Sequence, residues 1–140
     1  MKIPVMLTIC GKQYYADQEP ETIELTTEGT MEQTTNGWDI CYTESDLTGL
    51  AGVHTSFLVE PERIVLTRSG KLTSQMVFVQ GQSHDSLYQM EFGALMITVN
   101  ATAISSRLTQ TGGVVDLSYT IEIEQTAAGK IEYHLEIKKL

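Results

Sequence analysis

The sequence predicts an all-β domain in which about 8–10 strands form a closed antiparallel meander barrel. Apolar and polar residues alternate with a period of two along most of the chain, and short turns separate the alternating segments. No segment carries a convincing pattern for a long helix. The chain has 140 residues, which is the length of one domain, so we expect a single domain over residues 1–140.

The first strand is expected at residues 3–9, where the odd-numbered positions are apolar. Asn36-Gly37 then predicts a type I′ hairpin turn, because that turn needs a positive φ at two successive residues. Pro61 and the Ser69-Gly70 pair end two later segments, and Ala128-Gly129 predicts the last turn. In chain order, the alternating segments after the first are 23–31, 38–42, 53–59, 64–68, 72–78, 88–92, 95–99, 115–123 and 131–137.

Three stretches are less regular. Residues 44–52 indicate a loop or one helical turn, and His84-Asp85 indicates a turn after Gly81. The apolar residues Ala101, Ile104 and Leu108 are spaced as on one face of a helix, so a short helix is expected around residues 105–107.

Closure of the sheet follows from the short connections between neighbouring strands. Such strands pair in chain order, and an open meander would leave two exposed edges. No helix is available to cover the apolar face, so we expect the sheet to curl into a barrel, with a β-sandwich as the alternative. Small barrels are either filled by side chains or hold one small ligand.

The charge balance excludes two classes of partner. Nine Lys and Arg face eighteen Asp and Glu, which gives a net charge of −9. Binding to nucleic acid or to anionic lipid needs a cationic surface, so neither is expected. The two cysteines, Cys10 and Cys41, lack the number and spacing of a disulfide scaffold or a metal site, and they favour free thiols in the cytoplasm.

The sequence predicts no catalytic residues, no metal and no cofactor. His54, His84 and His134 are isolated from one another and have no metal-ligand spacing. Glu122 and Glu124 lie on the outward parity of one strand, which is typical of a solvated face. The glycine pairs lack the following helix that a phosphate-binding loop needs.

Five polar residues at inward positions form the candidate ligand site. Arg68 and Glu44 share the parity of the apolar residues on their strands, and a buried guanidinium needs a partner. Tyr42 and Thr55 come close by hairpin pairing, and Tyr88 belongs to another inward stripe. Arg68 would offer a two-pronged contact to a carboxylate or phosphate of a ligand. The alternative is that Arg68 and Glu44 pair with each other and plug one end of the barrel.

Several short motifs resemble the YwiB-like family of uncharacterised bacterial proteins. They are Tyr42-x-Glu44, Thr55, Arg68-Ser69-Gly70, Met76-x-Phe78, Gly81, Tyr88-x-Met90-x-Phe92-Gly93, Thr102, Gly113 and Leu117-x-Tyr119. The resemblance covers residues 3–137. It implies a small cytoplasmic protein with a calycin-like (lipocalin-like) closed barrel, and it supplies no activity, substrate or cofactor.

The leading hypothesis is a cytoplasmic protein that binds a small anionic or amphipathic molecule in the lumen or mouth of the barrel. Phe57, Phe78 and Trp38 would add to the apolar wall of the site. The alternative is a non-enzymatic structural or interaction module, such as a homodimer, whose barrel is filled by side chains. An enzyme ranks third, because no acid–base or nucleophile–base pair can be placed. The size of the lumen discriminates between the first two.

Overall fold

The computed structural model describes residues 2–15, 18–44, 51–90 and 93–140. Within these ranges ten strands pair antiparallel with their chain neighbours, and β1 pairs with β10 to close the ring. The strands are β1 (Lys2–Tyr14), β2 (Glu21–Gln33), β3 (Trp38–Thr43), β4 (His54–Glu60), β5 (Arg63–Ser69), β6 (Leu72–Val79), β7 (Ser83–Met90), β8 (Gly93–Thr109), β9 (Gly112–Ile123) and β10 (Thr126–Lys139). The predicted closed meander barrel is confirmed, and the sandwich alternative is excluded.

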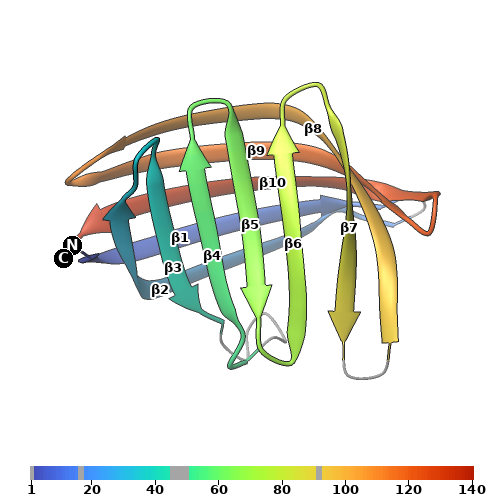
Figure 1. Cartoon of the computed structure of the whole chain (residues 1–140), viewed down its shortest axis with the longest axis horizontal. Coiled ribbons are helices and arrows are strands. Elements are labelled where there is room, and N and C mark those ends of the chain that lie inside the picture. The colour runs from blue at the N-terminus through green and yellow to red at the C-terminus, as the bar shows by residue number, and fades with distance from the viewer. Residues whose placement is uncertain (1, 16–17, 45–50, 91–92) are drawn as a thin grey trace.

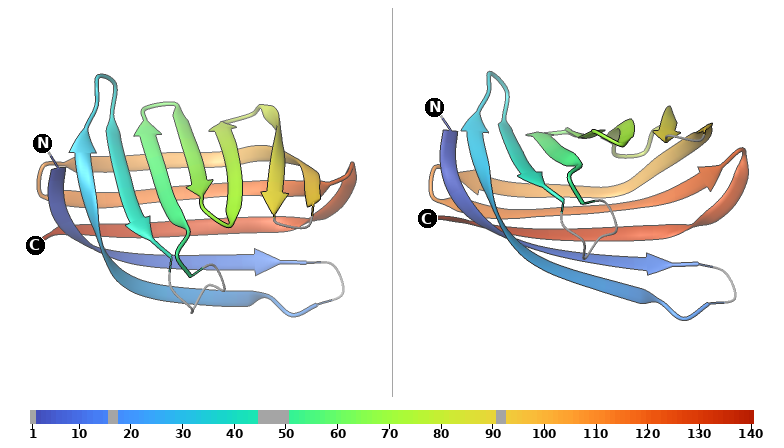
Figure 2. Two further views of the ribbon diagram at one scale, coloured as in Figure 1. Left: turned by 60° about the horizontal axis from the view of Figure 1, so that its bottom comes forward. Right: turned by 90° about the horizontal axis from the view of Figure 1, so that it is seen from below.

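The barrel consists of two crossed groups of strands. Figure 1 shows β3 to β7 in front of the long strands β1, β2, β8, β9 and β10, which run across them. Figure 2 shows the long strands curving beneath the shorter ones. The two chain ends lie side by side, and the Leu140 amide donates to the Pro4 carbonyl at 3.0 Å. Closure gives the outer edges of the first and last strands their hydrogen-bond partners.

The short helix expected around residues 105–107 is wrong, because β8 continues as a strand through this stretch. The pairing of β8 with β9 slips by one residue between Ala101 and Ala103. A bulge of this kind moves the inward side chains from odd to even positions. Ala101 is therefore inward before the bulge, and Ile104 and Leu108 pack against the core after it. The bulge reproduces the helical spacing of apolar residues without a helix.

Two of the predicted turns need correction, the first in its type and the second in its position. Neither Asn36 nor Gly37 has a positive φ, although β2 and β3 do form the expected hairpin. Gly37 is required there for another reason, since a Cβ would lie 1.9 Å from the Val59 carbonyl oxygen. The last hairpin turns at Glu124 and Gln125, with φ of 50° and 68°, rather than at Ala128-Gly129.

His84 and Asp85 lie within β7 and not in the predicted turn. The Thr98 hydroxyl on β8 donates to the Asp85 carboxylate at 2.7 Å, which ties the polar outer face of β7 to its neighbour. The loop or helical turn predicted at 44–52 lies mostly outside the described residues. The described part of the chain contains no helix long and apolar enough to cross a lipid bilayer.

The barrel is packed at one end and hollow at the other. Near the chain ends, Val5 and Leu7 of β1 and Leu135 of β10 are fully buried in the core. Further along the same two strands, Gly11 and Tyr133 line a cavity. These two residues face each other in register, and a Cβ on Gly11 would lie 3.3 Å from the Tyr133 ring. The absence of a side chain at Gly11 therefore makes room for the Tyr133 ring over β1.

Candidate functional site

The hollow end of the barrel contains a cavity of about 340 Å³. Nine of the ten strands, all but β4, contribute to its wall, and most of the lining is aliphatic or tyrosine. The lining residues are Ile9, Gly11, Gln13, Tyr15, Ile23, Leu25, Tyr42, Glu44, Arg68, Met76, Tyr88, Leu95, Ile97, Tyr119, Ile121, Ile123, Ile131 and Tyr133. Four of the five predicted site residues are among them, namely Tyr42, Glu44, Arg68 and Tyr88.

A row of polar side chains crosses four neighbouring strands in this part of the barrel. Tyr42 on β3 faces Thr55 on β4, Thr55 faces Arg68 on β5, and Arg68 faces Ser74 on β6. Residues directly opposite each other in antiparallel strands project to the same side of the sheet. The register therefore brings the four side chains into one inward row.

Thr55 does not line this cavity, but it contacts Glu44, which does. Its side chain is buried, and its hydroxyl donates to Glu44 Oε1 at 3.0 Å. Glu44 is only 4% exposed, although it lies just after the end of β3. The Thr55 hydroxyl thus helps to satisfy a buried carboxylate.

Arg68 is the cationic side chain of the cavity wall. Its Nε atom is buried and has no hydrogen-bond partner in the described part of the protein. Among the described residues, no ion pair joins Arg68 to Glu44. Burial acts to lower the pKa of the guanidinium, but the neighbouring Tyr133, Tyr42 and Glu44 outweigh it, so the pKa of Arg68 is raised. The guanidinium is therefore charged, and its Nε–H is available to an acceptor.

Tyrosine hydroxyls surround the guanidinium. Five of the six tyrosines of the chain line the cavity. Burial raises the pKa of Tyr42, and the Glu44 carboxylate raises it further. Burial also raises the pKa of Tyr88 and, more strongly, that of Tyr119. These phenols stay protonated at neutral pH and can donate hydrogen bonds. The wall next to Arg68 is therefore rich in donors.

Two tyrosines of the site were not among the residues predicted from the sequence. Tyr119 on β9 and Tyr133 on β10 have rings stacked with centroids 6.4 Å apart. Both lie on inward stripes, and this parity is the signal that the sequence offers for them, but the pattern marks them only as part of the apolar alternation. Phe57 and Phe78 are buried in the core and do not line the cavity, and Trp38 packs against the same core.

We expect Thr55→Val to lower the free energy of unfolding by about 1–3 kcal/mol, because it removes a donor from a buried carboxylate. Valine keeps the shape of threonine, so packing changes little. Urea denaturation measures the loss. The control is Thr43→Val on the exposed face of β3, where the hydroxyl contacts His54, and it should change stability by less than about 0.5 kcal/mol. Equal effects of the two substitutions would contradict a structural role for the Thr55–Glu44 bond.

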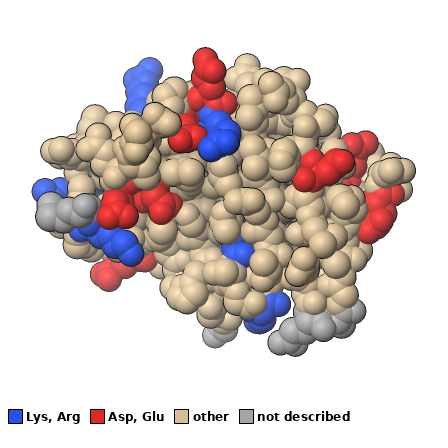
Figure 3. Space-filling view, in the orientation of Figure 1, with Lys and Arg blue, Asp and Glu red and all other residues tan. Residues whose placement is uncertain are grey.

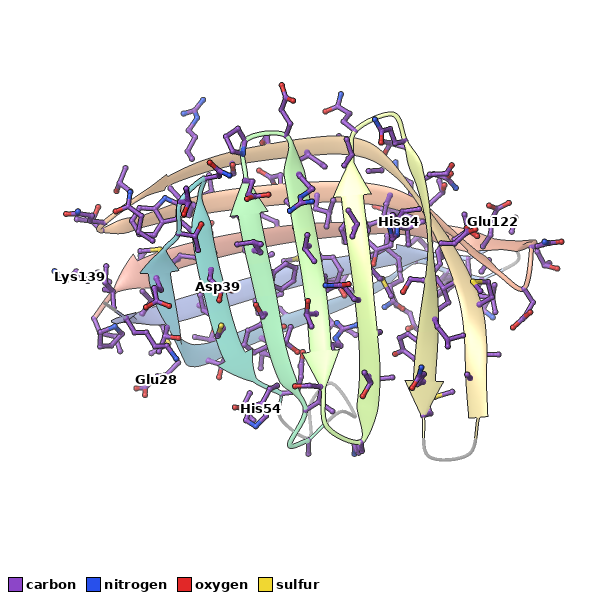
Figure 4. All side chains as sticks on the ribbon, viewed as in Figure 1. Glu28, Asp39, His54, His84, Glu122 and Lys139 are labelled. Atoms are coloured by element: carbon purple, nitrogen blue, oxygen red, sulfur yellow. The ribbon has the colours of Figure 1, made fainter. Side chains whose placement is uncertain are left out.

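The histidines do not gather into a metal site. Figure 4 shows His54 and His84 well apart, His54 at the lower edge of the view and His84 right of its centre. His134 lies on the outer face between two carboxylates, with Nδ1 at 2.5 Å from Asp116 and Nε2 at 3.3 Å from Glu136. Within the described ranges, no three His, Cys, Asp or Glu side chains are placed to hold a metal ion.

The pair of carboxylates around His134 predicts a pH dependence of stability. The hydrogen bond to Asp116, followed by that to Glu136, raises the pKa of His134 above its ordinary value of 6.5. The folded state therefore binds the proton more tightly than the unfolded chain does. This stabilisation is complete below pH 6.5, is lost as the pH rises through the folded-state pKa, and amounts to less than about 1 kcal/mol because the site is exposed. Urea denaturation across this range should show a decline that His134→Gln removes, and an unchanged decline would contradict the assignment.

The two cysteines are free thiols on different rows of the barrel. Cys10 faces Glu24 and His134, whereas Cys41 faces Thr30 and Ser56. The six-residue offset between these rows corresponds to about 20 Å along a strand. A disulfide spans less than about 7 Å between Cα atoms, so the two cysteines do not pair within one chain.

Acidic groups gather at the margins of the front face. Figure 3 shows Asp and Glu side chains near both ends of this face and at its upper part, while its centre shows a small basic patch and no acidic side chain. This distribution agrees with a net charge of −9 spread over the outer surface. Arg68, by contrast, is part of the cavity wall.

Fold and site together define a closed β-barrel whose lumen holds a cavity lined by tyrosines, aliphatic side chains and one arginine. The chain belongs to the family described as domain of unknown function (DUF1934), which matches residues 7–137. Its fold is similar to that of the crystal structure of ywiB protein from Bacillus subtilis, with a TM-score of 0.80 and 23% sequence identity over 96% of this chain and 92% of that chain. The predicted YwiB-like family is thus confirmed. No curated protein matches the chain at a significant level.

Proposed function

We propose that this protein binds a small anionic or amphipathic molecule in the cavity of the barrel. One observation carries the proposal: the charged guanidinium of Arg68 lines a cavity of about 340 Å³ with its buried Nε–H unpartnered among the described residues. A buried donor without an acceptor costs about 1–3 kcal/mol, and an oxyanion of a ligand would satisfy it.

The geometry supports this function over a plug that closes the barrel. A plug requires a direct ion pair between Arg68 and Glu44, and no such pair joins these two described residues. The cavity volume falls within the range of about 300–1,000 Å³ that is usual for small-molecule sites. A barrel filled by side chains would not leave such a space.

A cytoplasmic location and a binding role complete the proposal. Cys10 and Cys41 are free thiols that lie on different rows, as suits a reducing compartment. The polar groups near Arg68 are phenols and one carboxylate, which orient a ligand by hydrogen bonds and charge.

Native mass spectrometry of the protein purified from its own cells tests the proposal. We expect a one-to-one adduct that is released on denaturation, and we expect the emptied protein to bind an amphipathic anion such as anilinonaphthalene sulfonate. A protein without a retained adduct that also fails to bind this probe would contradict a binding function.

A further inference from the structure

Buried polar groups lie near the half-buried Arg68 in the part of the cavity that we call its floor, and the two most exposed residues of the lining are isoleucines at its mouth. Glu44 is 4% exposed, and Tyr42 and Tyr119 are also buried. Toward the open end, Ile23 and Ile123 are 39% and 36% exposed. The guanidinium and the two exposed isoleucines therefore mark separate places for the head and for the chain end of an amphipathic molecule.

We propose, on the basis of the proposed function, that the ligand is a monoanionic amphiphile with an aliphatic chain, bound head first. Its oxyanion accepts hydrogen bonds from Arg68 at the floor of the cavity. Its chain lies along the aliphatic wall and ends at the mouth, where it covers Ile23 and Ile123.

The charges at the floor limit the head of the ligand to at most one negative charge. Arg68 provides one positive charge, and Glu44 is close enough to influence the pKa of Arg68. A carboxylate head can accept charge-assisted hydrogen bonds from the guanidinium. A second negative charge on the head would meet the buried Glu44 carboxylate without a further cation in the cavity lining of the described residues.

The wall of the cavity offers an aliphatic surface to a hydrocarbon chain. Eight of its lining residues are isoleucine or leucine: Ile9, Ile23, Leu25, Leu95, Ile97, Ile121, Ile123 and Ile131. Each buried methylene contributes about 0.8 kcal/mol, which corresponds to about a fourfold gain in affinity. Affinity should therefore rise with chain length until the chain passes the mouth.

Titration calorimetry with hexanoate, octanoate, decanoate and dodecanoate tests whether the alkyl chain of the ligand binds in the cavity. We expect affinity to rise by up to about fourfold per methylene along this series. Binding of anilinonaphthalene sulfonate without any rise along the series would leave a binding protein but overturn the aliphatic, head-first ligand. Absence of binding by all of these probes, with no retained adduct, would instead overturn the proposed function itself.

Ile123→Lys distinguishes the two orientations, because Ile123 lies at the mouth. Head-first binding places the new ammonium against the chain, so decanoate should bind about tenfold more weakly or worse. In chain-first binding the new Lys ammonium would lie beside the carboxylate of decanoate. Binding would then become stronger, and this result would overturn the proposal. Leu87→Lys on the exposed outer face of β7 adds the same charge away from the cavity and should leave affinity within about twofold. Ile23→Lys repeats the test from β2, and circular dichroism establishes that each variant is folded.

Discussion

Arg68→Met is expected to weaken the binding of decanoate by about 30-fold or more while the barrel remains folded. The substitution removes charge-assisted hydrogen bonds to the oxyanion, each of which contributes about 1.5–3 kcal/mol. Methionine fills a similar volume and leaves no unpaired donor in the wall. Titration calorimetry measures the affinity, and urea denaturation measures the stability.

The same variant separates a ligand site from a structural plug. Breaking a buried ion pair costs about 3–5 kcal/mol, so a plug predicts a large loss of stability on Arg68→Met. A ligand site predicts a small change, because no ion pair joins Arg68 to Glu44 within the described structure. Arg63→Met on the same strand is the control, since Arg63 is exposed and pairs with Glu60, and it should leave binding unchanged. Unaltered affinity in Arg68→Met would contradict the proposed function.

Gly113→Ala is expected to lower the free energy of unfolding by more than about 3 kcal/mol. Gly113 has a φ of +148°, which side chains rarely adopt, and a Cβ would lie 1.8 Å from the Arg107 carbonyl oxygen. Relief of that overlap requires the backbones of β8 and β9 to separate where they pair. Thermal and urea denaturation measure the loss.

Gly93→Ala provides a control that matches the backbone angle without the overlap. Gly93 has a φ of +151°, and a Cβ there meets no described atom within 4 Å. Its substitution should cost about 1–3 kcal/mol from backbone strain alone. If the two alanine variants were equally stable, close approach of the strands would not be the reason for glycine at position 113.

The ring of strands and the polar row were predictable because they depend on local alternation. A period of two assigns each side chain to a face, and hairpin pairing places Tyr42, Thr55 and Arg68 opposite one another on successive strands. The inward position of Glu44 follows from the same parity, and its side chain is indeed buried.

The bulge in β8, the last turn and the position of Tyr133 could not be predicted, because they depend on backbone conformation and on how the barrel closes. The bulge near Thr102 leaves no pattern in the sequence other than a shift of parity, which imitates a helix. The tight turn at Glu124 and Gln125 uses positive φ without glycine, so the neighbouring Ala128-Gly129 was the stronger signal. Tyr133 on β10 lies close enough to Arg68 on β5 to raise its pKa. These two strands are not neighbours in the sheet, so the contact depends on how the strands are staggered when the ring closes.

A crystal structure of the protein with a terminally brominated alkyl carboxylate tests the central claim most directly, because bromine marks the chain end and the carboxylate marks the head. We predict the carboxylate within hydrogen-bond distance of the Arg68 guanidinium and bromine beside Ile23 and Ile123. A carboxylate bound outside the barrel, with Arg68 paired to Glu44 instead, would contradict it.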